Sequence, residues 1–242
     1  MSGTTASPPV AELDRLLELE RLATDAARDL DEASADEILQ WAARTFGDRF
    51  CVLSSMGDAV VASLAAKAKP GIDVVFLDTG YHFAETIGMR DAVAAVYDVN
   101  VVSALPLLTV AEQDDAHGKD LFARDPDACC AMRKVAPMEA ALVNYDSWAT
   151  GVRRDESSAR AMTPVVQWDA RRHKVKVNPI ARWSRDDVDT YIADNNILVS
   201  PLIDDGYLSI GCWPCTSKVA SGADPRSGRW VGHAKTECGI NT

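Results

Sequence analysis

Two amphipathic stretches lie near the N-terminus. Between Val10 and Leu30, leucines recur at helical spacing among charged residues, which predicts an amphipathic helix. A second helix is predicted to begin at Ser34, because Glu37 three residues later completes a capping box. We therefore expect residues 1–45 to form an N-terminal helical segment.

The pattern then changes to short, β-branched apolar runs that are typical of buried strands. Residues 50–54 and 74–77 are two such runs, and the alanine-rich and leucine-rich segment 58–69 between them predicts a helix, which makes a βαβ unit. Further strands are predicted at 99–102, 148–152 and 175–177, and further helices at 85–96, 128–142 and 184–195. Residues 46–205 are thus predicted to form an α/β domain with a mostly parallel sheet and helices on both faces.

The loops beyond the carboxyl ends of the strands are candidate binding loops, because ligands of such sheets bind there. After the first strand, Ser54 and Ser55 precede a helix, where hydroxyl and N–H groups suit a phosphate. An ordinary turn with a serine cap is an equally good interpretation. After the second strand, the backbone of Asp78, Thr79 and Gly80 could border an adenine or ribose, although Asp78 could instead cap the next helix.

A third candidate loop carries Arg153, Arg154 and Arg160 beyond a strand end. Guanidinium groups suit phosphate and sulfate because each can donate two parallel hydrogen bonds. The competing interpretation is a solvated arginine face paired with Asp155 and Glu156. Three arginines beside two other candidate anion loops favour anion binding.

The net charge of -11 argues against a general nucleic-acid binder, which needs lysine and arginine to neutralise phosphates. The chain lacks a signal-peptide pattern and any apolar run near the roughly 18 residues of a membrane helix, so we expect a cytoplasmic protein without a membrane partner. Basic residues predominate near the C-terminus. Residues 210–242 carry Asp224 and Glu237 against Lys218, Arg226, Arg229 and Lys235.

Cysteines provide the most specific signal. Cys129 and Cys130 are adjacent, whereas Cys212 and Cys215 form a C-x-x-C turn, and this spacing favours metal or redox chemistry over a disulfide scaffold. Four thiolates can hold zinc or a 4Fe-4S cube. Adjacent cysteines are unusual in structural zinc sites, so the pattern favours iron–sulfur. Two unrelated buried or redox pairs are the alternative.

Cys238 lies in the sequence KTECGIN, which has no apolar face. We expect residues 206–242, rich in glycine and proline, to form a cluster-binding loop and a mobile tail, so that this thiol can enter a site and leave it. Lys235 could favour the Cys238 thiolate, and Glu237 would oppose it. Cys51 lies inside a predicted strand and is assigned a structural role.

In combination, these segments resemble the bacterial adenylyl-sulfate (APS) reductase family. The resemblance rests on LSSMGD, LDTGYHFAET, the CC pair followed by Arg133 and Lys134, GVRRDESSARA, IGCWPCT, DPRSGRW and KTECGI, in the family's order after about residue 45. It implies an adenine-nucleotide α-hydrolase-like (PP-loop) fold and thioredoxin-dependent reduction of adenosine 5′-phosphosulfate to sulfite and AMP. Within the wider family, the four cysteines distinguish cluster-containing APS reductases from 3′-phospho-APS reductases.

The resemblance also implies roles for individual residues. Cys238 is the expected nucleophile, and it would carry an S-sulfonate until thioredoxin releases sulfite. The expected ligands of a 4Fe-4S cluster with an electrostatic and structural role are Cys129, Cys130, Cys212 and Cys215. The expected substrate-binding residues are Ser54, Ser55, Asp78, Thr79, Gly80, Lys134, Arg153, Arg154, Arg160, Arg226 and Arg229.

Two positions depart from the family pattern. Asn241 stands where the family usually has histidine, and the phosphate loop reads SSMG without the two glycines of an ATP-cleaving PP-loop. The alternatives are a 3′-phospho-APS reductase, a PP-loop ATP pyrophosphatase or sulfurtransferase, and a zinc-stapled binding module. A homo-oligomer is compatible with all of them.

Overall fold

The structure is a computed structural model, and it describes residues 10–220 and 222–241. The N-terminal segment consists of α1 (Val10–Asp29) and α2 (Ala35–Phe46), followed by the short η1 (Gly47–Arg49). The predicted capping box begins α2: Ser34 Oγ accepts a hydrogen bond from Glu37 N at 3.3 Å, and the Glu37 carboxylate accepts one from Ser34 N at 2.8 Å. Both predicted N-terminal helices are therefore confirmed.

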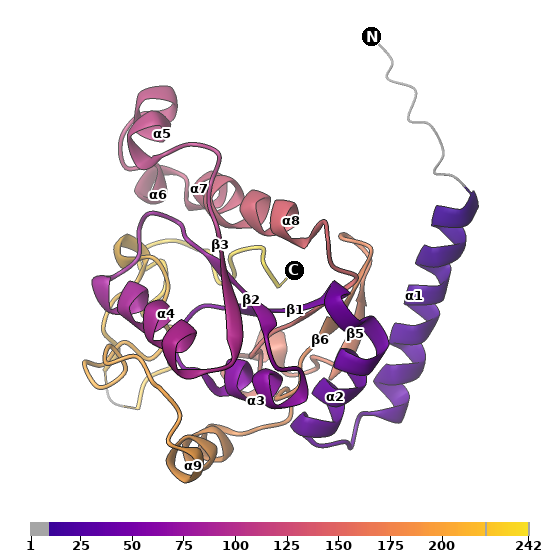
Figure 1. Ribbon diagram of the computed structural model, residues 1–242. Coiled ribbons are helices and arrows are strands. Elements are labelled where there is room, and N and C mark those ends of the chain that lie inside the picture. The colour runs from indigo at the N-terminus through magenta and orange to yellow at the C-terminus, as the bar shows by residue number, and fades with distance from the viewer. Residues whose placement is uncertain (1–9, 221, 242) are drawn as a thin grey trace.

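Six strands form one sheet in the order β3-β2-β1-β4-β6-β5 (Figure 1). Neighbouring strands are parallel except β5, which runs antiparallel to β6. The strands are β1 (Phe50–Ser54), β2 (Ile72–Leu77), β3 (Val99–Ala104), β4 (Ser147–Ala149), β5 (Val166–Asp169) and β6 (Lys174–Val177). The predicted mostly parallel sheet is confirmed, with β5 as an unpredicted edge strand and β4 shorter than expected.

Helices cover both faces of the sheet (Figure 1). On one face, α2, α3 (Val60–Ala68) and α4 (Ala84–Val96) contribute to the larger apolar core. On the other face, Met138 and Leu142 of α8 (Ala136–Leu142) pack with Val75 and Trp148 in a second core. The remaining regular helix after the sheet is α9 (Arg185–Asn195).

The region predicted as one helix at 128–142 contains three pieces. It comprises α7 (Pro126–Cys130), the π-helical segment η2 (Ala131–Val135) and α8. A π segment widens the helical turn and is frequent at functional sites. Arg133 and Lys134 lie in this segment and are both buried. Two helices that the sequence analysis did not predict precede it, α5 (Val110–His117) and α6 (Leu121–Arg124).

The chain after α9 is mostly irregular. Its described part contains the short η5 (Trp213–Cys215) and an isolated antiparallel bridge between Thr216 and Arg229. The last described residues lie between α8 and the sheet (Figure 1), where Ile240 packs against the second core. Across the described ranges, the helices are all too short or too polar to cross a membrane.

Candidate functional site

The three candidate loops lie at one edge of the sheet. Because β1, β2 and β4 are parallel, the residues that follow Ser54, Leu77 and Ala149 leave the sheet on the same side. Two short 3-10 helices, η3 (Arg154–Glu156) and η4 (Ser158–Arg160), form part of the third loop. The structure thus brings together loops that are far apart in sequence.

The first loop is shaped by its own side chains. Ser54 Oγ accepts a hydrogen bond from Met56 N at 3.2 Å, and Met56 has a positive φ of 61°. Asp58 Oδ1 accepts one at 3.0 Å from the backbone N–H of Val60, the first residue of α3. Ser55 is exposed at the top of this turn.

Arg133 fixes the second loop. Its guanidinium donates to the carbonyl of Thr79 and, at 3.0 Å, to Gln113 Oε1. Gly80 has a φ of +73°, and a Cβ at that position would stand 3.0 Å from Arg133 Nη2. The loop therefore requires glycine next to this buried arginine. Arg133 was not among the predicted site residues, although its place three residues after Cys130 was a signal.

The second loop also holds the C-x-x-C turn. Thr79 Oγ1 lies 3.2 Å from Cys212 Sγ, and Trp213 N donates to the carbonyl of Tyr81 at 2.8 Å. Both contacts join residues that follow β2 to the irregular chain after α9. They bring Cys212 and Cys215 to the carboxyl edge of the sheet.

Four cysteines line one small cavity at this edge, together with Lys134 and Arg133. They are the predicted ligands Cys129, Cys130, Cys212 and Cys215. Burial raises the pKa of Cys129 to about 12 and that of Cys215 to about 11, and the neighbouring thiols add to both shifts. Such thiols lose their protons when they bind a cation, so binding would release protons.

The four thiols are the donor type that zinc or an iron–sulfur cube takes as thiolates, and all four line one cavity. Within the described residues, no group of three or more cysteine, histidine or carboxylate side chains is arranged to hold a metal ion.

Lys134 lines this cavity and also lies within the electrostatic reach of the tail cysteine. Burial lowers the pKa of Lys134, but the charges of Cys212 and Cys238 more than offset this and raise it above its usual value. Burial is the main cause that raises the pKa of Cys130, and the nearby Cys238 raises it further. The half-buried Cys238 thus lies in the same electrostatic environment as the buried lysine and the cysteine pair.

The predicted arginines have different partners. Arg160 and Arg226 both contact Glu237, with Arg160 Nε and Nη2 each 2.9 Å from a carboxylate oxygen and Arg226 Nη2 at 3.2 Å. Arg153 pairs with Asp155 at 3.0 Å, as in the competing interpretation of this loop. These pairs place Arg160 and Arg226 beside Cys238.

Two predicted arginines lie elsewhere. Arg154 donates to the carbonyl of Thr163 at 2.8 Å and pairs with Asp31 at 3.2 Å, in the connection between α1 and α2. Arg229 lies against the C-x-x-C turn, with Nη1 3.3 Å from the carbonyl of Ile210. The structure therefore gathers Lys134, Arg160 and Arg226 around the tail and directs Arg154 away from it.

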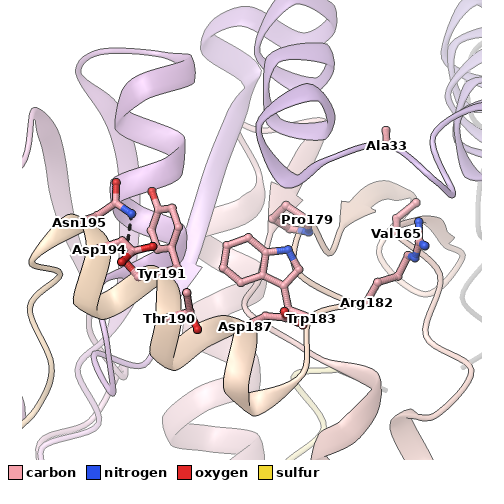
Figure 2. A pocket seen from close by; sticks show the side chains of 10 residues that line it. All are labelled: Ala33, Val165, Pro179, Arg182, Trp183, Asp187, Thr190, Tyr191, Asp194 and Asn195. Atoms are coloured by element: carbon pink, nitrogen blue, oxygen red, sulfur yellow. Dashed lines mark hydrogen bonds between the residues drawn. The ribbon is translucent and has the colours of Figure 1, made fainter.

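A separate groove lies along α9 (Figure 2). It is lined by Trp183 and Tyr191, whose rings are 5.3 Å apart, and by polar residues such as Asp187 and Asn195. None of the predicted site residues lines it. The chemistry-bearing side chains are concentrated at the carboxyl edge of the sheet instead.

Known proteins similar in sequence to this chain are named as reductases of adenosine phosphosulfates. Residues 49–218 match the family described as "Phosphoadenosine phosphosulfate reductase domain". Proteins named adenosine 5′-phosphosulfate reductase from Streptomyces coelicolor and Mycobacterium tuberculosis are 62% and 52% identical, over 93% and 95% of this chain and 95% and 98% of their own lengths.

Solved structures agree on the fold. Phosphoadenylyl-sulfate reductase from Candida auris, solved as a phosphate complex, has a TM-score of 0.68 at 27% identity and covers 88% of this chain and 99% of its own. FMN adenylyltransferase from Candida glabrata has a TM-score of 0.52 at 11% identity, covering 87% and 80%, and shares the fold alone. The chain belongs to the phosphoadenosine phosphosulfate reductase family.

Proposed function

We propose that this protein reduces adenosine 5′-phosphosulfate to sulfite and AMP in assimilatory sulfate reduction. The observation that carries the proposal is the position of Cys238 near buried Lys134 and Cys130, two residues that line the four-cysteine cavity. Relatives named for this activity at 52–62% identity support the substrate. The PP-loop type of fold supports the adenylate portion.

Cys238 is the proposed nucleophile. Its thiolate attacks the sulfur of the phosphosulfate, an S–S bond forms, and the S–O bond to the phosphate breaks. AMP leaves with the electron pair of that bond, and Lys134 and Arg226 stabilise the charge that develops on it. The product on the enzyme is a Cys238 S-sulfonate. Its sulfonate group leaves as sulfite in the next step.

A dithiol completes the reaction, and thioredoxin is the proposed one. A thioredoxin thiolate attacks Cys238 Sγ, sulfite leaves, and a mixed disulfide forms. The second thioredoxin thiol resolves this disulfide and regenerates the Cys238 thiol. The two electrons that reduce the sulfate group thus come from the dithiol. Attack on Cys238 requires the tail to leave its position over the sheet, because Cys238 is half-buried there.

Cys129, Cys130, Cys212 and Cys215 are the proposed ligands of a 4Fe-4S cluster. When bound, such a cluster supplies a fixed charge beside the substrate and joins the C-x-x-C turn to α7. The contact between Thr79 Oγ1 and Cys212 Sγ would be a hydrogen bond to a ligand sulfur. Lys134 stays positioned by the π segment in which it lies. We propose no electron delivery from the cluster to the substrate.

A 3′-phospho-APS reductase is the second candidate. The family description and the Candida auris structure support it, since both names contain that substrate. The cysteine pair and the C-x-x-C turn favour APS, because by resemblance the reductases of the 3′-phosphorylated nucleotide lack these cysteines.

Sulfite production from the two nucleotides separates the candidates. The full chain, prepared anaerobically, is supplied with either nucleotide, thioredoxin, thioredoxin reductase and NADPH, and AMP or its 3′-phosphate is quantified alongside sulfite. We expect preference for APS by at least about a hundredfold in kcat/KM, as expected when a buried site must accommodate an extra charged group. Preference for the 3′-phosphorylated nucleotide, or release of pyrophosphate from ATP, would overturn the proposal.

A further inference from the structure

Lys176 is a lysine in the middle of a buried strand. It lies on β6, is 2% exposed, and stands beside Trp148 of β4 in the parallel register. Its ammonium lies 5.0 Å from the centre of the Trp148 ring. Lysines are almost never fully buried without a partner, because burial of a charge is costly. Lys176 therefore needs hydrogen-bonding or charged partners at this position.

Arg172 lies beside Lys176 and is also buried. Its side chain is 4% exposed, it pairs with Asp169 at 2.9 Å, and its guanidinium lies 5.9 Å from the centre of the Trp148 ring. Asp169 on β5 pairs with Arg172 and also acts on Lys176, which feels the charges of Arg160 and Glu237 as well. The cations around Lys176, itself included, thus outnumber the two carboxylates.

The C-terminal tail provides the remaining partners. Lys176 Nζ donates to Asn241 Oδ1 at 3.0 Å, and Arg172 Nη2 donates to the carbonyl of Gly239 at 2.9 Å. Ile240, between these two residues, packs into the second apolar core. Each of the three residues after Cys238 thus has its own contact on the sheet.

The other side of Cys238 is fixed as well. Glu237 is held by Arg160 and Arg226, and Arg226 Nη2 also donates to the carbonyl of Thr236 at 2.7 Å. Both chain neighbours of Cys238 are therefore held, Glu237 by Arg160 and Arg226 and Gly239 by Arg172. The arginines before it belong to the predicted anion site, whereas Arg172 and Lys176 do not.

We infer that Arg172 and Lys176 are positioning residues that hold the tail after Cys238 against the sheet and so place its thiol in the site. This inference rests on the proposed role of Cys238 as nucleophile. The two cations touch the backbone and the amide of the tail, never the thiol itself. Asn241 accepts the hydrogen bond from Lys176 in this arrangement. This gives a function to the position where the APS reductase family usually has histidine.

The test measures the reactivity of Cys238 and needs no substrate. The full chain, prepared anaerobically, is treated with iodoacetamide, and modification of the Cys238 peptide is followed by mass spectrometry. In Arg172→Met, Lys176→Met and Asn241→Ala we expect modification about fivefold faster, the factor that corresponds to the loss of one hydrogen bond. Arg171→Met is the matched control, because this neighbouring arginine is 53% exposed and pairs with Glu139.

Turnover of APS gives a second readout. The three variants should lose kcat by a similar factor while KM does not rise, since these residues do not bind the nucleotide. Lys176→Arg should recover kcat and slow modification, because it keeps a donor at this position. Asn241→Ala removes the contact from the tail, so its result stands even where a core variant fails to fold.

Two results would overturn the inference: wild-type rates of Cys238 modification in all three variants, or the same acceleration in Arg171→Met. If Cys238 modification accelerates in the variants but the wild-type protein does not reduce APS, the positioning role stands and the proposed function fails. If the variants reduce APS at the wild-type rate and their Cys238 modification is unchanged, the proposed function stands and the positioning role fails.

Discussion

Arg160 holds the carboxylate of Glu237 with two parallel hydrogen bonds of 2.9 Å each, and Glu237 directly precedes Cys238. A guanidinium that binds a carboxylate in this way is also suited to a phosphate or sulfate. The docked tail therefore occupies a group that we expect the substrate to use. Arrival of the anionic substrate and docking of the thiol are coupled through one arginine.

Replacement of Glu237 by glutamine tests this competition. A neutral side chain pairs less strongly with Arg160, so the anion should bind more easily while the thiol is held less firmly. We expect KM for APS and kcat each to fall by roughly three- to tenfold, the range for loss of a charge-assisted hydrogen bond. Steady-state kinetics measure both. Glu139→Gln, at an exposed ion pair with Arg171, is the control, and an increased KM in Glu237→Gln would contradict the competition.

Cys212 and Cys51 form a matched pair for the cluster proposal. Cys212 lines the cavity beside Thr79, whereas Cys51 is fully buried within β1. Anaerobically purified Cys212→Ala should lose its visible absorbance and most of its iron, and Cys51→Ala should keep about four irons per chain. Iron and sulfide analysis measures this. Equal iron content in the two variants would rule out Cys212 as a ligand.

Gly80→Ala should disturb the loop that joins β2 to the C-x-x-C turn. The new Cβ would meet Arg133 Nη2 at 3.0 Å and Val110 Cγ2 at 3.1 Å, at a φ of +73° that alanine tolerates poorly. We expect a loss of about 1–3 kcal/mol in the free energy of unfolding. Gly88→Ala, within α4 and with open space around it, should instead stabilise by about 0.5–1 kcal/mol. Chemical denaturation of both variants checks the sign.

The buried Lys176 makes stability depend on pH. Burial lowers its pKa from 10.5 to about 8 in the fold. Between these pH values the unfolded chain binds more protons than the folded chain, so this lysine's contribution to stability rises with pH; below about pH 8 its buried charge opposes folding. Lys176→Met should therefore gain stability relative to wild type at pH 7, on the order of 3 kcal/mol less the lost tail contact.

That advantage should shrink as the pH rises from 7 to 10. Melting temperatures of both proteins across this range measure it, with Lys119→Met, at an exposed position, as the control. A constant difference between Lys176→Met and wild type would show that the lysine keeps its charge in the fold. Such a buried charge, retained at a cost in stability, agrees with a positioning role for Lys176.

Local patterns predicted the fold well where they agreed with the packing. Strand β1 has the predicted bounds, and the capping box at Ser34 begins α2 as expected. Helix α5 was missed although Thr109 and Glu112 form a capping box, because only Gln113 among its residues is buried and no apolar periodicity appears. The π segment at 131–135 also has no period of its own in the sequence.

The site was predictable in its parts more than in its contacts. Spacing identified the four cysteines that line the cavity, and strand ends identified the three loops. The K-V-K-V run of β6 suggested no site, because alternation alone does not reveal that the distant tail covers Lys176. The partners of Arg160 and Arg172 likewise depend on a segment without periodicity, so they could be found only in three dimensions.

Detection of the S-sulfonate on Cys238 by mass spectrometry tests the proposed mechanism most directly. Wild type and Cys238→Ser are incubated anaerobically with APS in the absence of any dithiol, and intact and peptide masses are recorded. We predict that wild type gains one SO₃ group on Cys238 and releases one AMP, while Cys238→Ser gains none. Formation of the adduct in Cys238→Ser, or its location on another cysteine of the wild type, would contradict the assignment of the nucleophile.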